Sequence, residues 1–384
     1  MDNVSIISDQ YCCGCGICSI ICSGGVKLTL DKNGYYKSRI DEDMCTHCGR
    51  CVKVCPCNLS PEPVLKPSFV GFSKSEDSAV KSTSGGAGYE IARLCIEKGY
   101  TVIGAAWSSD FSQVEHIAVD TVEGLETLRK SKYVQSYTPD AFKKIAELDK
   151  VAVFGTPCQI AGIRALYGNR EDLILVDFDC MGPAGLNLWQ KALRYYHSIN
   201  ASDIISLRMR DKKKSWMMYG TSVTFDSSKA YWRDKFHDPF CVLYHFGRTI
   251  QDACIRHCKY LNASMADIRI GDAWGYTDGF SRRQIKSGLS ILTPLTDVGQ
   301  RVLEDISDRM ELRSAERIDQ KPSDTGCNER IVDCLNASDK TIEDAVAIYN
   351  DVGFSKRMMR RVSYVLSANE TVYLLIKRVL RKFR

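Results

Sequence analysis

The 384-residue sequence contains no apolar run approaching the roughly 20 residues that a helix needs to cross a bilayer. It opens without the charged-then-apolar pattern of a signal peptide. Its net charge is only +5, its basic residues are not gathered with aromatic ones, and no helix-turn-helix or RNA-binding signature is present. We therefore expect a cytoplasmic protein, soluble or peripheral, with no nucleic-acid partner.

Cysteine, by contrast, is abundant. Ten of the 18 cysteines come before residue 58, and eight of these form two runs of the pattern C-x2-C-x2-C-x3-C, the second followed by Pro56. The first run is Cys12, Cys15, Cys18 and Cys22, and the second is Cys45, Cys48, Cys51 and Cys55. Such spacing implies reduced thiolates in a reducing compartment rather than a disulfide framework.

The two runs are typical of bacterial two-cluster ferredoxins, in which the fourth cysteine of each run ligates the other cluster. We therefore predict one [4Fe–4S] cluster on Cys12, Cys15, Cys18 and Cys55, and a second on Cys45, Cys48, Cys51 and Cys22. The alternative is zinc, which takes four ligands, commonly as paired C-x2-C units. Zinc does not explain three evenly spaced cysteines plus a fourth, written twice. Cys13 and Cys57 are surplus, and we predict that they are packed or spare.

The remaining chain divides by composition. Between the two runs, alternating residues around Asn33-Gly34 predict a hairpin. We predict a ferredoxin-like α+β module over 1–60, a proline-rich linker over 61–68, an α/β domain with a mainly parallel sheet over 69–310, and a helical, basic region over 311–384.

Within the α/β domain, apolar runs that begin near residues 69, 101, 151, 172, 267 and 289 predict strands, and residues 204–225 are strand-rich. Helices are predicted over 87–98, 139–149, 157–168, 185–198 and near 297–308. We interpret Lys212, Lys213 and Lys214 as a solvated turn. The terminal segment 372–384 predicts a basic amphipathic helix, either docked on its own domain or resting on a membrane surface.

Three features beyond the ferredoxin runs carry candidate chemistry. Ser84, Gly85 and Gly86 precede a predicted helix, where free backbone N–H groups could meet a phosphate, although a capped glycine loop explains them equally. Thr156 precedes Pro157 and Cys158. Three roles fit this cysteine: a nucleophile, a metal ligand or a buried structural thiol. Four thiols outside the ferredoxin runs could serve one more cluster: Cys158, Cys180, Cys254 and Cys258.

Taken in order, the motifs resemble those of the coenzyme F420 hydrogenase/dehydrogenase beta-subunit family. They are the ferredoxin runs, STSGG (82–86), SKYVQS (131–136), FGTPCQIAG (154–162), VDFDCMG (176–182) and DIRIGDAWG (267–275). The likeness extends to about residue 300. In the family the last cysteine pair is C-x2-C, whereas here three residues separate Cys254 from Cys258, so Cys258 aligns and Cys254 is displaced by one position.

This resemblance implies an α/β domain that binds FAD and exchanges electrons with iron–sulfur clusters, including a third [4Fe–4S] cluster on Cys158, Cys180, Cys254 and Cys258. By position, it places eight residues beside FAD: Ser84, Gly85, Gly86, Lys132, Tyr133, Gln135, Ser136 and Thr156. No side chain declares itself a general acid or base. Tyr133, His116 and His245 qualify only by type.

Two functions follow from the resemblance. The first is an oxidoreductase that moves electrons between a ferredoxin-like donor and a small organic substrate, for which the family context suggests a link to surface polysaccharides. The second is an electron-transfer subunit that docks on a partner subunit and has no substrate of its own. The fold does not choose between substrates.

Overall fold

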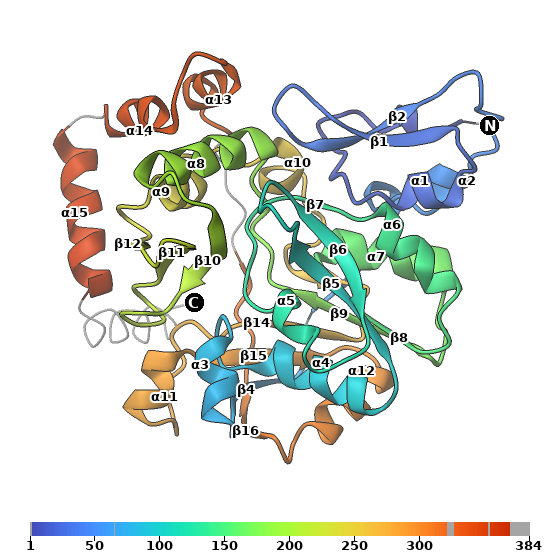
Figure 1. Ribbon diagram of the computed structural model, residues 1–384. Coiled ribbons are helices and arrows are strands. Elements are labelled where there is room, and N and C mark those ends of the chain that lie inside the picture. Colours follow the sequence, from blue (N-terminus) through green and yellow to red (C-terminus); the bar gives the residue numbers. More distant parts are fainter. Residues whose placement is uncertain (1, 65, 321–325, 352–353, 369–384) are drawn as a thin grey trace.

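The computed structural model describes residues 2–64, 66–320, 326–351 and 354–368 (Figure 1). The amino-terminal module lies at one end of the molecule and is built around the hairpin of β1 (Val26–Leu30) and β2 (Tyr36–Ile40), which pair antiparallel. Four short helices complete it: η1 (Val4–Ile6), α1 (Ile17–Ile21), α2 (Arg50–Lys53) and η2 (Pro56–Asn58).

The hairpin turn is confirmed, with a longer loop than a two-residue turn. Gly34 has a φ of +77°, a region that glycine enters without steric cost. The Asp31 carboxylate accepts hydrogen bonds from the backbone N–H groups of Asn33 and Tyr35, both at 2.9 Å. The loop therefore spans residues 31–35, closed by an acidic side chain as well as by glycine.

A nine-stranded sheet forms the centre of the molecule (Figure 1). Its strand order is β16-β4-β15-β14-β9-β8-β5-β6-β7. The four central strands β14, β9, β8 and β5 run parallel, whereas β16, β4 and β15 pair antiparallel on one side and β6 pairs antiparallel with β5 on the other. The predicted parallel sheet is thus confirmed at its centre, and the sheet as a whole is mixed. The strands, in chain order, are β4 (Ser68–Ser73), β5 (Thr101–Trp107), β6 (Val114–Val119), β7 (Ser136–Tyr137), β8 (Val151–Gly155), β9 (Leu173–Phe178), β14 (Ile268–Asp272), β15 (Ser290–Pro294) and β16 (Met310–Ala315).

Helices cover both faces of this sheet. On one face α4 (Ala87–Glu97) and α12 (Asp297–Asp305) bury Ile91 and Val302 against the strands. On the other, α6 (Pro139–Lys143) and α7 (Pro157–Tyr167) pack together with the ferredoxin module, whose Ile17 lies among Phe142 and Ile160. The ferredoxin module therefore shares one hydrophobic core with this face of the α/β domain. Four further short helices are α3 (Glu76–Lys81), α5 (Leu125–Leu128), η3 (Lys144–Ala146) and α11 (Arg282–Ser287).

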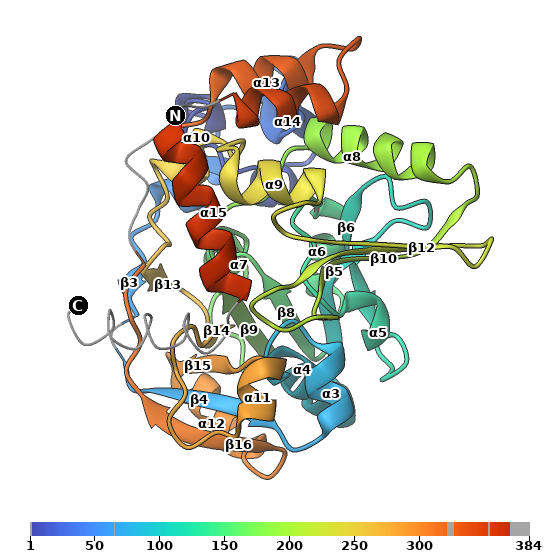
Figure 2. The ribbon, with the colours of Figure 1, turned by 90° about the vertical axis from the view of Figure 1, so that its left-hand side faces the viewer.

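A second layer is built on an antiparallel sheet of β10 (Ile204–Asp211), β11 (Gly220–Phe225) and β12 (Ala230–Asp234). Large aromatic side chains, including Trp189 and Phe240, fill the space between this sheet and the helices around it. These are α8 (Leu186–Ile199), α9 (Pro239–Phe246), α10 (Asp252–Ile255), α13 (Glu329–Asn336) and α14 (Ile342–Asn350). Helix α15 (Phe354–Ala368) runs along the outside, where Tyr364 meets Phe236 edge-on (Figure 2).

Two segments differ from expectation. In the predicted linker, β3 (Glu62–Pro63) pairs with β13 (Ala263–Ser264), so this stretch is tied to the α/β domain. Residues 311–315, predicted as helical, instead belong to edge strand β16, because their backbone pairs with β4 along its full length.

The predicted solvated turn is correct for Lys213 and Lys214, which are exposed, but wrong for Lys212. The Lys212 ammonium points inward and donates to the carbonyls of Ala79, Ser84 and Ser287. The terminal segment 372–384 lies outside the described residues. Within the described part of the chain, no helix combines the length and apolar character needed to traverse a bilayer.

Candidate redox site

A cavity of about 1260 Å³ opens where the central parallel strands end. Thr156 follows β8, Cys180 follows β9, and Asp272 ends β14, and all three line it. Open α/β sheets place their ligands at this edge, outside the carboxyl ends of the strands. The volume exceeds the 300–1,000 Å³ of ordinary small-molecule pockets, so the space suits a large cofactor or a cofactor with its substrate.

Cysteines of the two ferredoxin runs interact with one another. A hydrogen bond with Cys57 and burial raise the pKa of Cys55, and negative charge on Cys15, from the other run, adds to the rise. Burial likewise raises the pKa of Cys51, and charge on Cys22, again from the other run, raises it further. Cys55 is therefore within electrostatic reach of Cys15, and Cys22 of Cys51. These contacts between the runs are compatible with an exchange of ligands, and the ligand sets themselves stay a prediction.

The four remaining candidate ligands all line the cavity. Burial raises the pKa of the Cys180 thiol to about 12, and charge on Cys158 and Cys258 contributes. Burial is also the main cause that raises the pKa of Cys254. The charges of Cys180, Cys158 and Cys258 raise it further. Cys254 is thus within electrostatic reach of Cys158, Cys180 and Cys258, so residues far apart in the sequence gather at one place. The displaced Cys254 belongs to this group.

Close packing brings Cys254 there. Gly182 has a φ of +91°, and a Cβ at this position would lie 2.6 Å from the Cβ of Cys254. A side chain at position 182 would therefore push the loop after β9 away from α10. Across the described residues, no three His, Cys, Asp or Glu side chains converge on one metal ion. The assignment of these cysteines to a cluster consequently rests on their identity and shared location.

The surplus cysteines join the two parts of the site. Cys13 and Cys57 both line the cavity. Hydrogen bonding of the Cys13 thiol with Cys15, Cys158 and Cys57 raises its pKa well above the ordinary value. The same contact with Cys13 lowers the pKa of Cys158. Sequence reasoning offered no signal for this bridge, because it depends on how the module docks.

The first group of predicted flavin residues lies at the start of α4. Ser84 and Gly86 line the cavity, and Gly86 precedes the helix with a φ of +95°. Gly85 faces the other way: a Cβ there would lie 2.3 Å from the Gly71 carbonyl oxygen, so its lack of a side chain lets the loop pack on β4. The Ser84 hydroxyl lies 2.9 Å from that of Ser290.

The second group also lines the cavity. Lys132 donates to the Arg129 carbonyl at 2.9 Å, and burial lowers its pKa to about 7. Tyr133 stacks on Tyr244 with ring centroids 4.7 Å apart. Ser136 accepts a hydrogen bond from the Gln159 side chain at 3.2 Å. Thr156 places its hydroxyl 3.2 Å from the Cys158 sulfur.

Gln135 has a structural task in addition to lining the cavity. Its side-chain oxygen accepts from the Tyr36 N–H at 2.6 Å, and its side-chain nitrogen donates to the Cys13 carbonyl at 3.0 Å. Thr138 adds a third bond of this kind, to the Cys15 carbonyl at 2.8 Å. These contacts hold the ferredoxin loop against the cavity wall.

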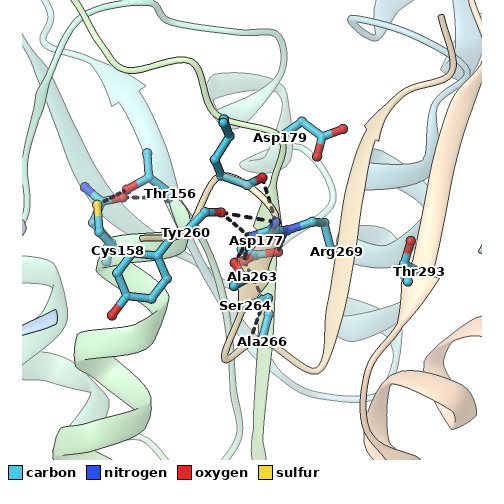
Figure 3. A network of polar contacts seen from close by, with 12 residues as sticks. Thr156, Cys158, Asp177, Asp179, Tyr260, Ala263, Ser264, Ala266, Arg269 and Thr293 are labelled. Carbon is cyan, nitrogen blue, oxygen red and sulfur yellow. Dashed lines mark hydrogen bonds and ion pairs between the residues drawn. The ribbon is translucent and has the colours of Figure 1, made fainter. Parts of the chain in front are cut away.

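A buried ion pair fixes the segment that follows Cys258 (Figure 3). Arg269 on β14 donates from Nε and Nη2 to the two oxygens of Asp177 on β9, at 2.9 and 2.7 Å. It also donates to the carbonyls of Tyr260 and Ala263. The Tyr260 hydroxyl in turn donates to the Pro56 carbonyl of the ferredoxin module at 2.7 Å. One buried guanidinium therefore connects both strands with the cysteine loop.

The histidines that qualified by type are buried and neutral at pH 7. Burial lowers the pKa of His116 to about 4 and that of His245 to about 3. His116 Nε2 lies 3.2 Å from the Phe154 carbonyl, and its Nδ1 has no partner among the described residues. His245 Nε2 lies 3.0 Å from the Tyr219 hydroxyl. Neither can act as a cationic acid near neutral pH.

Sequence reasoning missed one conspicuous group on the cavity wall. Arg210, on β10, is only 5% exposed and pairs with Asp272 at 2.7 Å. Its guanidinium lies over the rings of Tyr219 and Trp274, at 4.6 and 5.3 Å from their centroids. A lone arginine in a strand carries no recognisable signal, although Asp272 and Trp274 stand in the DIRIGDAWG motif.

Comparison with known proteins gives the class of this chain. Residues 148–320 match the carboxy-terminal part of the coenzyme F420 hydrogenase/dehydrogenase beta-subunit family, and residues 37–60 match a 4Fe-4S binding domain. Residues 148–320 therefore carry the carboxy-terminal domain of that family, and the amino-terminal end of the chain carries a 4Fe-4S ferredoxin domain. It is an iron–sulfur protein of oxidoreductase type.

Three relatives show how far the likeness reaches. A coenzyme F420-dependent sulfite reductase of Methanocaldococcus jannaschii is 32% identical over 44% of this chain, which spans only 28% of that protein's length. One of the subunits of the F420H2 dehydrogenase of Methanosarcina mazei is 23% identical over 80% of this chain and 85% of its own. An uncharacterised ferredoxin of M. jannaschii is 36% identical over 18% of this chain and 92% of its own.

Proposed function

We propose that this protein passes electrons between [4Fe–4S] clusters and FAD in order to reduce or oxidise a small organic substrate. One observation carries the proposal. A single cavity is lined by seven of the eight predicted flavin residues (all but Gly85), by four cysteines suited to a third cluster, and by the Cys13–Cys15 loop of the ferredoxin module. Electron transfer requires such proximity of the cofactors.

The donor sets fit three clusters. Soft thiolates are the ligands that iron–sulfur clusters select. Two clusters take the crossed ferredoxin sets given above, and the third takes Cys158, Cys180, Cys254 and Cys258. The chain's own contribution at the third site is burial, the Thr156 hydroxyl beside Cys158, and the Gly182 N–H, which donates to the Cys180 sulfur at 3.3 Å. Hydrogen bonds to sulfur and burial are the means by which a protein sets a cluster's potential.

The cavity also fits FAD. Ser84 and Gly86 bring a hydroxyl and free N–H groups of the α4 start to one wall, where a helix dipole favours phosphate oxygens. The His116 Nδ1 and the Arg129 Nε, both buried without a partner among the described residues, are further polar groups on this cavity. When bound, FAD would supply hydride exchange with a substrate and single-electron exchange with the clusters. Lys132, with a pKa of about 7, can hold or release a proton at Nζ beside that space.

Cofactor content of anaerobically purified protein tests this proposal. We expect about twelve irons per chain, since each cluster holds four, and FAD in the acid supernatant. A Cys158→Ala variant should retain about eight irons, because its ferredoxin ligands are intact. A matched Cys95→Ala variant, whose thiol is buried in the packing of α4, should retain all twelve. A colourless supernatant would refute the flavin, and unchanged iron in Cys158→Ala would refute the third cluster.

A second function is favoured by the similarity to one component of a multi-subunit dehydrogenase, along 85% of that component's length. In this second function the chain passes electrons to a partner subunit and turns over no substrate itself. Turnover of an added acceptor by the isolated chain with reduced ferredoxin supports the enzyme. Activity that appears only after a partner subunit is added supports the electron-transfer role. The sugar-linked substrate suggested by the resemblance stays a prediction.

A further inference from the structure

The buried edge of Arg210 is an unfilled binding group on the cavity wall. Its Nη1 donates to Asp272 Oδ2 at 2.7 Å and to the Tyr133 hydroxyl at 3.3 Å. Among the described residues, neither Nε nor Nη2 has a hydrogen-bond partner, although both atoms are buried. Buried donors in native proteins almost always have partners, so this pair of N–H groups requires an explanation.

The two free atoms are neighbours on one edge of the planar guanidinium. That edge presents two parallel N–H groups, which match the two oxygens of a carboxylate or phosphate. Two other arginines of this protein show the fit. Arg269 uses Nε and Nη2 to hold both oxygens of Asp177, and Arg170 uses the same atoms to hold Asp172 at 3.0 and 2.6 Å. At Arg210 the equivalent edge has no carboxylate partner among the described residues.

The surroundings favour a ligand with negative charge. Asp272 neutralises Arg210 from the Nη1 side. Lys212 is within electrostatic reach of Arg210 and Asp272, and because burial lowers its pKa to about 7, it adds part of a positive charge at pH 7. Tyr133, Tyr219 and neutral His245 contribute no charge on this side of the cavity at pH 7. Trp274 stacks on Trp216 with ring centroids 4.1 Å apart. The Arg210 guanidinium lies over this stacked pair, on the face of the Trp274 ring.

We propose that the free edge of Arg210 binds an oxyanion of the substrate, a carboxylate or a phosphate group. This inference rests on the proposed function, for which it supplies the substrate class: an acidic organic molecule held at its anionic end beside the aromatic side chains. Tyr133 connects this subsite to the cysteines, because it stacks on Tyr244, whose hydroxyl donates to the Gly182 carbonyl at 2.9 Å. The anion would therefore be anchored at a wall that leads to the third-cluster loop.

Calorimetric titration of the full-length, anaerobically purified protein tests the subsite. The probes are benzoate, inorganic phosphate and neutral benzyl alcohol. The variants are Arg210→Lys, which keeps a cation for Asp272 but removes the paired N–H edge, and Arg210→Gln. Arg283→Gln is the control, because that side chain is 79% exposed. Circular dichroism establishes that each variant is folded, and FAD content is measured alongside.

We expect at least one anion to bind the unaltered protein and the control equally, and benzyl alcohol not to bind. Arg210→Lys should weaken benzoate by roughly 10- to 100-fold, the worth of a charge-assisted hydrogen bond, and phosphate by less, because lysine acts as a point charge. Binding of benzoate identifies a carboxylate site, and binding of phosphate alone identifies a phosphate site.

Failure of both anions to bind, or equal binding to both Arg210 variants and the unaltered protein, would overturn the subsite. Loss of FAD from Arg210→Lys would assign the oxyanion to the cofactor and overturn the substrate class. If the unaltered protein lacked FAD, the proposed function would fail, while anion binding at Arg210 would still be measured separately.

Discussion

Replacing Arg269 with methionine should destabilise this protein more than any surface substitution of the same type. Arg269 is 1% exposed and Asp177 is fully buried, so the substitution leaves a carboxylate in the interior without its counter-ion. Breaking a buried ion pair from one side typically costs about 3–5 kcal/mol. The bonds to the Tyr260 and Ala263 carbonyls are lost as well, so the upper part of that range is expected.

In a thermal scan this loss should lower the midpoint by roughly 6–20 °C, taking about 2–4 °C per kcal/mol for a large domain. Arg283→Met removes an exposed pair with Glu76 and should change the free energy of unfolding by less than about 1 kcal/mol. The double variant Arg269→Met/Asp177→Leu should be more stable than Arg269→Met alone, because no uncompensated charge remains.

The Arg269→Met variant should also lose iron preferentially from the third cluster, because the segment after Cys258 is held by the same guanidinium. Iron and thermal midpoint are measured on the same anaerobic samples. If Arg269→Met shifted the midpoint no more than Arg283→Met, the claim that this pair organises the site would be refuted.

Three further predictions follow from the site. Gln135→Ala removes two hydrogen bonds to the ferredoxin backbone, so it should lower the free energy of unfolding by about 1–3 kcal/mol. It should also raise the rate of proteolysis within residues 1–60, and a cleavage rate equal to that of the unaltered protein would contradict the role of Gln135 in holding the module. Gly182→Ala introduces a Cβ 2.6 Å from that of Cys254 at a φ of +91°, and it should lower iron by about four per chain while FAD is retained; full iron content would contradict the packing argument. Burial lowers the pKa of His116 from 6.5 to about 4, so the unfolded chain binds the additional proton below pH 6.5 and stability falls as pH decreases. Between pH 7 and 5.5 the protonation of His116 in the unfolded chain should lower the free energy of unfolding by about 1 kcal/mol, and this loss should be absent from His116→Gln. Denaturant midpoints of both proteins at the two pH values measure the difference.

The sequence predicted those features that are encoded locally. Cysteine spacing specifies a ferredoxin module because each ligand is fixed by its neighbours along the chain. Alternating apolar runs and amphipathic stretches predicted β8, α7, β9 and α8 because each element buries its own periodic face. Edge strand β16 was missed, since its charged residues face solvent and its strand character comes from pairing with β4.

Features that depend on docking could not be predicted. Gln135 was expected beside FAD, but its amide also holds the ferredoxin loop, a contact 122 residues away in sequence. Lys212 resembled its solvated neighbours, and its three carbonyl acceptors come from separate segments: helix α3, the loop before α4 and the last residue of α11. Arg210 had no motif of its own, because its unfilled edge is visible only once Asp272 and Tyr133 are in place.

The most direct test of electron transfer is rapid mixing of the anaerobic protein with reduced ferredoxin while cluster and flavin absorption are followed together. We predict that the clusters are reduced first and that the flavin then bleaches, with a marked delay in Cys158→Ala, whose ferredoxin clusters still fill. Flavin reduction at the same rate in both proteins, or a preparation that contains zinc in place of iron and no flavin, would contradict the account.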